Sequence, residues 1–193
     1  MSDSYHHGNL RQALIDAGIR IINESGEDAL SLRKAALACN VSHAAPYAHF
    51  KDKEELIGAM QESVTEQFMK ELEDAVKEAP DRENALVMMG RRYVSFFLKN
   101  PDYFRFLFGN RSISAHLMPD ADPGKDYPPF VLLKKTYLDY LKENDLQKSA
   151  KEQEIELLKL WASAHGLAAI ACMSGVVPSF DWEEMLKGDI LLR

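Results

Sequence analysis

The feature that most constrains this chain is a helical repeat of apolar residues that runs through nearly its whole length. The longest example begins after Asp52 and stops at Pro80. Its apolar residues recur every four positions, at Leu56, Met60, Val64, Phe68, Leu72 and Val76. This spacing places the side chains along one face of a helix. No segment shows the alternation typical of a half-buried strand, so the sequence predicts an all-α protein.

Capping and breaking residues divide this pattern into about nine helices. Ser31, Ser42, Asp52, Asp81 and Ser149 stand where helices would begin, because their side chains can accept hydrogen bonds from free backbone N–H groups. The predicted helices cover residues 10–25, 32–38, 43–48, 52–79, 82–99, 101–108, 130–141, 149–174 and 181–193. Residues 109–129 contain four prolines and two glycines, which favours a long, partly mobile loop.

Charge is distributed unevenly along the chain. The 193 residues carry a formal net charge of −7, but residues 1–53 hold six Lys/Arg and six Asp/Glu, so that this part is neutral. We therefore expect a small head, residues 1–53, and a larger acidic body, residues 54–193, joined by the helix over 52–79. The overall acidity argues against general coating of nucleic acid, although a neutral head rich in histidine can still approach a polyanion.

Several classes of protein are disfavoured by what the sequence lacks. Cys39 and Cys172 cannot build a disulfide framework, and no Cys/His cluster has zinc spacing. His116 lies near Asp120 and Asp122, but nothing in the sequence fixes the geometry of a metal site there. There is no glycine-rich phosphate loop, apolar signal region or membrane span, so we expect a cytoplasmic, non-enzymatic protein without a cofactor.

The first 60 residues have the layout of a helix-turn-helix. Two short helices are separated by Asn40, a residue that tolerates the left-handed backbone of a sharp turn, and a long helix follows. The second short helix carries small residues that allow close approach to a DNA groove, and polar ones that can contact bases or phosphates. A helical hairpin within a larger bundle would give the same pattern, so the layout alone leaves both interpretations open.

The residue types at particular positions of this layout distinguish between the two interpretations better than the layout does. The runs Val41-Ser42, Tyr47-Ala48-His49-Phe50 and Lys53-Glu54-Glu55-Leu56 closely resemble the DNA-binding head of the TetR (tetracycline repressor-like) transcriptional regulators. The lead-in over residues 5–11 resembles the start of one branch of that family, and Trp161, His165 and Gly166 resemble the Trp-His-Gly signature of the same branch.

This resemblance implies a homodimer whose heads read a roughly palindromic operator on double-stranded DNA. It assigns contacts with the groove to Ser42, His43, Ala44 and Ala45, contacts with phosphates to Tyr47, His49 and Lys53, and a position near the DNA backbone to Ser31 and Arg33. Leu37 and Ala38 occupy positions that are often basic in the family. We therefore expect a shallower salt dependence than a strongly basic head would give.

For the body, the resemblance implies dimerisation through the last two helices and binding of a small-molecule effector that releases a repressor from DNA. A row of small residues, Ala162, Gly166 and Ala169, would permit close helix approach, with Leu158, Trp161, His165 and Cys172 on the other side. Candidate pocket residues are Phe68, Met89, Tyr93, Phe97, Phe104, Trp161 and His165. Ordinary core packing explains the same aromatic residues. The alternative function is an all-α ligand-binding or interaction module that does not bind DNA.

Overall fold

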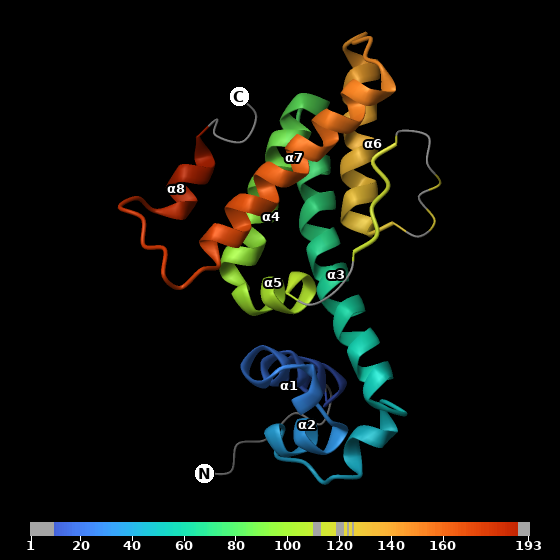
Figure 1. Ribbon diagram of the computed structural model, residues 1–193, viewed down its shortest axis with the longest axis vertical. Helices are drawn as coiled ribbons and strands as arrows, with labels where there is room; N and C mark the ends of the chain where they lie inside the picture. The colour runs from blue at the N-terminus through green and yellow to red at the C-terminus, as the bar shows by residue number, and fades with distance from the viewer. Residues whose placement is uncertain (1–9, 110–112, 119–121, 123, 125, 189–193) are drawn as a thin grey trace.

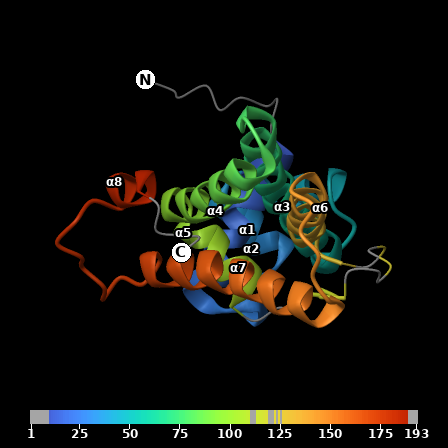
Figure 2. The ribbon, with the colours of Figure 1, turned by 90° about the horizontal axis from the view of Figure 1, so that it is seen from above.

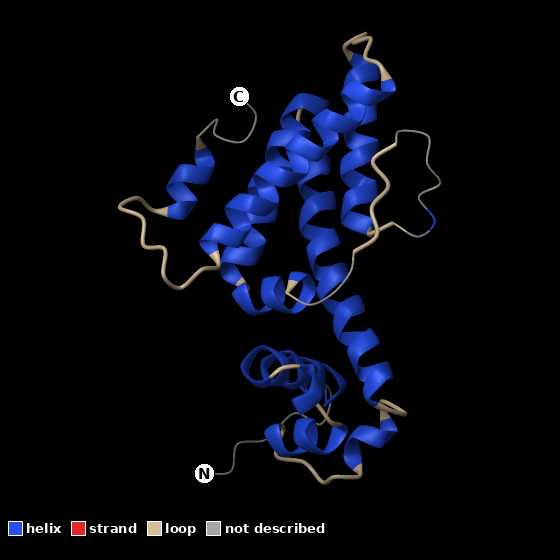
Figure 3. Ribbon diagram, viewed as in Figure 1, coloured by secondary structure: helices blue, strands red, loops and turns tan. Residues whose placement is uncertain are grey.

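The computed structural model describes residues 10–109, 113–118, 122, 124 and 126–188, and within them all regular structure is helical (Figure 3). Eight α-helices and two 3-10 turns are present in this part of the chain, close to the nine helices predicted. They are α1 (Leu10–Ser25), η1 (Glu27–Ala29), α2 (Leu32–Ala38), η2 (Ala45–Ala48), α3 (Lys53–Glu78), α4 (Arg82–Lys99), α5 (Pro101–Phe108), α6 (Pro128–Glu143), α7 (Ala150–Ala171) and α8 (Trp182–Lys187).

Most of the predicted helix starts are confirmed by their caps. The side chains of Ser31, Asp52, Asp81 and Ser149 each accept a hydrogen bond from the backbone N–H three residues further on. Ser149 and Glu152 form a complete capping box, in which the Glu152 carboxylate also accepts from the Ser149 backbone N–H at 2.8 Å. These local bonds explain why the boundaries could be derived from the sequence.

The prediction of a helix over residues 43–48 capped by Ser42 is wrong. The structure has only a 3-10 turn, η2, whose N-cap position is Ala44 and which has no side-chain cap. Because Pro46 has no N–H, it cannot donate to the Ser42 carbonyl and start an α-helix. The chain instead makes tighter bonds, from Ala45 N to Ser42 O at 3.0 Å and from Tyr47 N to Ala44 O at 3.2 Å.

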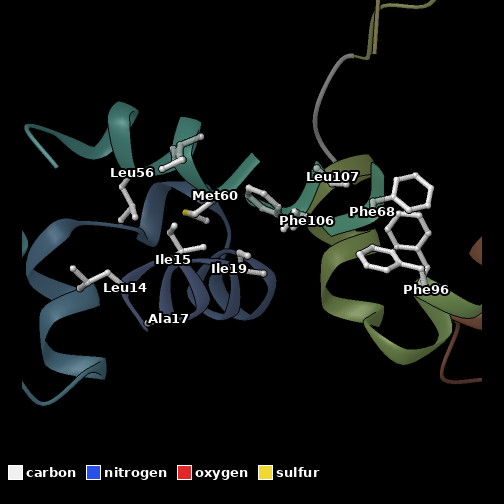
Figure 4. Close-up of a cluster of buried hydrophobic side chains, with 14 of the residues drawn as sticks. Leu14, Ile15, Ala17, Ile19, Leu56, Met60, Phe68, Phe96, Phe106 and Leu107 are labelled. Carbon is white, nitrogen blue, oxygen red and sulfur yellow. The ribbon is translucent and has the colours of Figure 1, made fainter. Parts of the chain in front are cut away.

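One helix, α3, belongs to both parts of the molecule (Figure 1). Its first half packs against α1, where Leu56 and Met60 are fully buried with Leu14 and Ile15 of the head (Figure 4). Its second half packs against α4 in the body, where Phe68 is also fully buried. The predicted division into a small head and a larger body is therefore bridged by a continuous helix of 26 residues.

The body is a helical bundle organised around α4, which packs against α3, α6 and α7. The short helix α5 lies at the lower end of the bundle and contacts α1 of the head (Figure 1). Helix α7 runs along one edge of the body, and α8 packs against α4 on another side (Figure 2). None of the helices in the described residues is both long and apolar enough to cross a membrane.

The C-terminal helices are shorter than predicted. Helix α7 ends at Ala171 rather than at Ser174, and α8 ends at Lys187, where Gly188 closes it with a backbone bond to Met185. The predicted continuation of the last helix over 189–193 lies outside the described residues, as do the lead-in over residues 5–9 and several positions of the predicted loop. Proline opens α6, which begins at Pro128.

Candidate DNA-binding head and body cavity

A sharp turn after α2 sets the direction of the predicted DNA-reading segment. Asn40 has a φ of 55°, as the sequence predicted, and two backbone bonds close the end of the helix around it. The Val41 N–H donates to the Ala36 carbonyl, and the Asn40 N–H donates to the Leu37 carbonyl, both at 3.0 Å. This is the bonding pattern of a Schellman motif, which fixes the angle at which the chain leaves α2.

Most of the predicted DNA-contacting side chains lie on one exposed stretch around η2. Ser42, His43, Ala44, Tyr47 and His49 are all exposed, and the Tyr47 side chain has more than half of its surface free. Ala45 is half-buried. Pro46, within the same stretch, is buried in the head. The exposed side chains of this stretch are therefore accessible to a DNA duplex.

Two further elements flank this stretch. Arg33 is exposed near the start of α2, while Ser31 is half-buried because its side chain caps that helix. The Lys53 ammonium donates to the Glu27 carbonyl at 2.7 Å, so its position at the start of α3 is fixed within the head. A lysine ammonium has three N–H donors, so the two that are not bonded to Glu27 can still donate to a phosphate oxygen.

Sequence reasoning passed over one exposed apolar residue of the head. Leu37 lies on α2 with 72% of its surface exposed, in a position noted above only because it is not basic. An exposed leucine beside the predicted DNA-contacting stretch would be able to meet sugars or thymine methyl groups rather than phosphates.

The body contains a cavity between α3, α4, α6 and α7. The cavity is narrow, with a volume of about 40 Å³. The lining residues are Leu72, Leu86, Met89, Gly90, Tyr93, Tyr127, Pro129, Phe130, Leu133, Leu160, Trp161 and Ala164. All of these side chains are uncharged, and their few polar groups belong to two tyrosines and a tryptophan.

Three of the seven predicted pocket residues, Met89, Tyr93 and Trp161, line this cavity. The other four, Phe68, Phe97, Phe104 and His165, form an aromatic cluster behind it. Phe68 and Phe97 are fully buried with their ring centroids 4.8 Å apart, so they are packed core rather than cavity wall. Helical spacing alone does not distinguish a residue that lines a cavity from one that fills the layer behind it.

His165 connects the cavity wall to this aromatic cluster. Its Nδ1 lies 2.9 Å from the hydroxyl of Tyr93, and its ring lies 5.1 Å from Phe104 and 4.7 Å from Phe108, measured between centroids. Burial lowers the pKa of His165 below 6.5, and burial raises the pKa of Tyr93 well above 10. Both groups are therefore neutral at pH 7, and the imidazole holds the phenol in place through a neutral hydrogen bond.

The Tyr127 hydroxyl is a second polar group at the cavity. It is buried and makes no hydrogen bond of good geometry, although Thr65 is close enough to oppose part of the burial-driven rise in the Tyr127 pKa. The ring of Tyr127 lies edge-on to Phe108 at 6.3 Å. Two chains of ring contacts therefore join the cavity wall to Phe108 of α5. One is the contact of Tyr127 with Phe108, and the other runs from Trp161 through His165 to Phe108.

Helix α5 lies between this cavity and the head. Phe106 and Leu107 of α5 are buried in the same core as Ile19 of α1 (Figure 4). The Asn23 side chain at the end of α1 donates to the Asp102 carbonyl of α5 at 2.9 Å. Phe104 and Phe108 on α5 meet His165, so one short helix contacts both the head and the wall behind the cavity.

His116, which the sequence places near two aspartates as in a metal site, contacts a different aspartate in the structure. The His116 Nδ1 lies 2.7 Å from the buried side chain of Asp126. Burial acts to raise the pKa of Asp126, but the hydrogen bonds from His116 outweigh it and lower that pKa. Asp122 is exposed and accepts from the Gly124 N–H, while Asp120 lies outside the described residues. Among the side chains described, no three His, Cys, Asp or Glu residues are grouped so as to hold a metal ion.

Comparison with known proteins agrees with the head and the fold. Residues 14–60 match the family model of the bacterial regulatory proteins of the tetR family. No curated protein matches the chain. A protein of unknown function from Rhodococcus sp. RHA1 is 27% identical, with 96% of this chain and 94% of that chain covered and a TM-score of 0.64.

More distant structures share the complete fold. A putative fatty acid metabolism regulator from Clostridium perfringens is 14% identical, with a TM-score of 0.68 over 91% of this chain and 92% of that one. The TetR family regulator PfmR from Thermus thermophilus is 18% identical, with a TM-score of 0.60 over 90% and 92%. The chain therefore has the fold of helical transcription regulators with a helix-turn-helix head. The match to the tetR family model lies in the head, over residues 14–60.

The buried His165 predicts a specific pH dependence of stability. Because its pKa is lower in the folded protein than in the unfolded chain, the unfolded state binds more protons below about pH 6.5. The free energy of unfolding should therefore fall as the pH drops from about 7 to about 5, and the His165→Gln variant should lose less over this range. Denaturant titrations at several pH values measure this difference, with the exposed His43→Gln as control. Parallel curves for His165→Gln and the unsubstituted protein would contradict a neutral, buried His165.

Proposed function

We propose that this protein is a dimeric, sequence-specific DNA-binding regulator of transcription, and that it acts as a repressor released by a small-molecule effector. The observation that carries the proposal is the segment from Ser42 to His49, most of whose side chains are exposed, set at a fixed angle after α2 within the residues that match the tetR family model. We assign the readout of bases to Ser42, His43, Ala44 and Ala45, and contacts with the DNA backbone to Ser31, Arg33, Tyr47, His49 and Lys53.

The short 3-10 turn η2 favours recognition of DNA by close approach of the protein backbone to the bases. Ala44, Ala45 and Ala48 have no side chain beyond Cβ, so the backbone of this segment can come near the floor of the major groove. Because the head is neutral, phosphate attraction contributes less than in a basic reader. Specific binding then depends on the fit of two heads on one duplex, and a homodimer supplies the second head.

The chemistry of the cavity limits the class of effector. Its described lining contains no Asp, Glu, Lys, Arg or His, so an ionised ligand would lose its hydration without gaining a counter-charge. Aromatic and aliphatic walls with two buried tyrosine hydroxyls suit an uncharged, largely apolar molecule with one hydrogen-bonding group. The small accessible volume means that the walls must separate for such a molecule to enter, and this separation is what would couple binding to shape.

We infer that α5 carries this coupling to the head. A ligand that pushes on Tyr127 or Trp161 also acts on Phe108 and His165, and both are in contact with α5 or form part of it. Movement of α5 would change its packing on α1 and the hydrogen bond from Asn23. The ligand would act by binding more tightly to a conformation of the body in which the spacing of the two heads does not match the operator. Operator affinity then falls by the ratio of the ligand's affinities for the two conformations of the body.

Selection of bound duplexes from a random library tests the proposed function. We expect enrichment of a palindrome with half-sites about one helical turn apart, or a multiple of that distance. Retesting the selected duplex at several salt concentrations should give a shallow slope, because few phosphates are neutralised. Failure to enrich any sequence above background would contradict the proposal, and would favour an all-α ligand-binding or interaction module instead.

Two substitutions separate readout from positioning in the head. His43→Ala should both weaken binding and relax the sequence preference at one position of each half-site, by about 1–3 kcal/mol of lost discrimination. Lys53→Gln should weaken binding about equally for all duplexes and reduce the salt slope. Binding assays on the selected duplex and on single-base variants measure both effects. Sequence-blind losses from both substitutions would contradict the assignment of His43.

Filling the cavity should imitate the effector. Ala164 is buried and lines the cavity, so Ala164→Leu adds volume where a ligand would push. We expect roughly a tenfold loss of operator affinity in a folded protein, together with a destabilisation of about 1–3 kcal/mol from overpacking. Adding Asn23→Ala, which removes the bond to α5, should restore part of the affinity. An unchanged affinity in a folded Ala164→Leu variant would contradict the coupling.

A further inference from the structure

A groove on the surface of the body lies next to the cavity. It runs between α4, α6, α7 and the linker that joins α6 to α7, and its volume is about 470 Å³. Three of its lining side chains, Glu83, Lys159 and Ser163, are exposed, so the groove is open to solvent. The cavity, in contrast, is enclosed by apolar and aromatic walls.

The groove and the cavity share part of one wall. Leu86 of α4 and Leu160 of α7 line both of them, so at these two positions the partition between them is one residue thick. Leu86 is almost fully buried, whereas Leu160 is only half-buried. A leucine side chain has no hydrogen bond to break when it changes rotamer, so Leu160 can yield at little cost.

The bulkier residues of the cavity wall are held more firmly. The Tyr93 hydroxyl lies 2.9 Å from His165 Nδ1, and the Trp161 ring packs on Phe130 with the centroids 5.2 Å apart. The Tyr127 backbone N–H donates to the Ser114 carbonyl at 2.8 Å. Opening the cavity between Leu86 and Leu160 therefore disturbs fewer polar and ring contacts than opening it at the tyrosines or the tryptophan.

The chemistry of the groove differs from that of the cavity. The buried Tyr137 hydroxyl donates to Glu156 Oε2 at 2.5 Å, and the Lys148 ammonium donates to the other oxygen of the same carboxylate. Lys159 and Glu83 add one charge of each sign, so the lining holds two lysines and two glutamates and has no net charge. An ionised group in the groove would meet a like charge as well as an opposite one, whereas an uncharged polar group can hydrogen-bond to either.

We propose that the groove and the cavity form one elongated site, joined between Leu86 and Leu160, for an uncharged amphipathic molecule. Its apolar end occupies the cavity, and its hydroxyl or amide groups lie in the groove against Tyr140 and Ser163. The proposal rests on the proposed function, because it specifies the class of effector. A cavity of about 40 Å³ is too small for most ligands, whose sites measure roughly 300–1,000 Å³, but the cavity and the groove together fall within that range.

Alkyl β-glucosides test the two ends of the site. They are uncharged, and their binding to the full chain can be measured below micelle-forming concentrations by displacement of N-phenyl-1-naphthylamine, an uncharged apolar dye. From butyl to octyl glucoside we expect the affinity to rise by about fourfold per added methylene, as each enters the cavity.

Filling the groove should affect only the ligand that extends into it. Ser163→Trp should weaken binding of octyl glucoside by at least about tenfold and change the affinity for the dye, which fits the cavity alone, by less than about twofold. Lys151→Trp is the matched control, because Lys151 is exposed on the same helix and does not line the groove. Octyl glucoside binding that is unaffected by Ser163→Trp would overturn the composite site.

The rate of dye binding tests the opening. Leu160→Ala should bind and release the dye at least about threefold faster, because a side chain that must move has been removed. Leu133→Ala is the control, since Leu133 is also half-buried and lines the cavity but not the groove. Equal rates for the two variants, or no binding of the dye by the unsubstituted protein, would also overturn the proposal. These assays contain no DNA, so such a result would leave the proposed DNA reading untouched, and failure to enrich a duplex would leave this site untouched.

Discussion

The continuity of α3 is the constraint on which the other relationships in this molecule depend. Its first half completes the core of the head with Leu56 and Met60, and its second half completes the core of the body with Phe68 and Leu72, all of them almost fully buried. Any rotation of the head relative to the body must bend this helix or slide it against one of the two cores. Closely packed interiors resist such sliding, so the head can move only over a small range relative to the body.

A second contact between head and body, through α5, makes the position of the head depend on the packing around the body cavity. The head rests on α5 through buried apolar residues and the hydrogen bond from Asn23, while the opposite side of α5 meets the neutral His165. The cavity lies just beyond, with walls that must separate before a ligand can enter. In this arrangement a small displacement near Trp161 reaches the head by way of one short helix, and α3 sets how far the head can swing.

The sequence predicted those features that depend on local interactions. Serine and aspartate caps marked the starts of α2, α3, α4 and α7, and Asn40 marked the left-handed turn, because each of these acts within a few residues along the chain. Pro46 changes the expected helix into a 3-10 turn, because a single backbone donor is missing at this position. Helical periodicity also identified the buried face of α3, which carries Leu56, Met60, Val64, Phe68 and Leu72.

Features that depend on packing between distant elements were not accessible in the same way. Nothing in the local pattern separated Met89 and Tyr93, which line the cavity, from Phe68 and Phe97, which fill the layer behind it. The sequence pattern predicts Leu158 on the same side of α7 as Trp161, but 49% of its surface is exposed, because the side of a helix that faces its own body depends on which neighbours pack there. The position of α8 on α4 likewise rests on contacts between residues far apart in the sequence, such as that of Arg91 with Gly188, which are 97 residues apart.

The most direct test of this account is the effect of half-site spacing on DNA binding by the full chain. Two heads fixed by α3 to a pair of bodies should tolerate little change in the distance or angle between their half-sites. Inserting five base pairs at the centre of the selected duplex turns one half-site by about half a helical turn, and the account predicts that affinity falls to that of an isolated half-site. Retention of full affinity after this insertion would contradict a rigidly coupled dimeric reader.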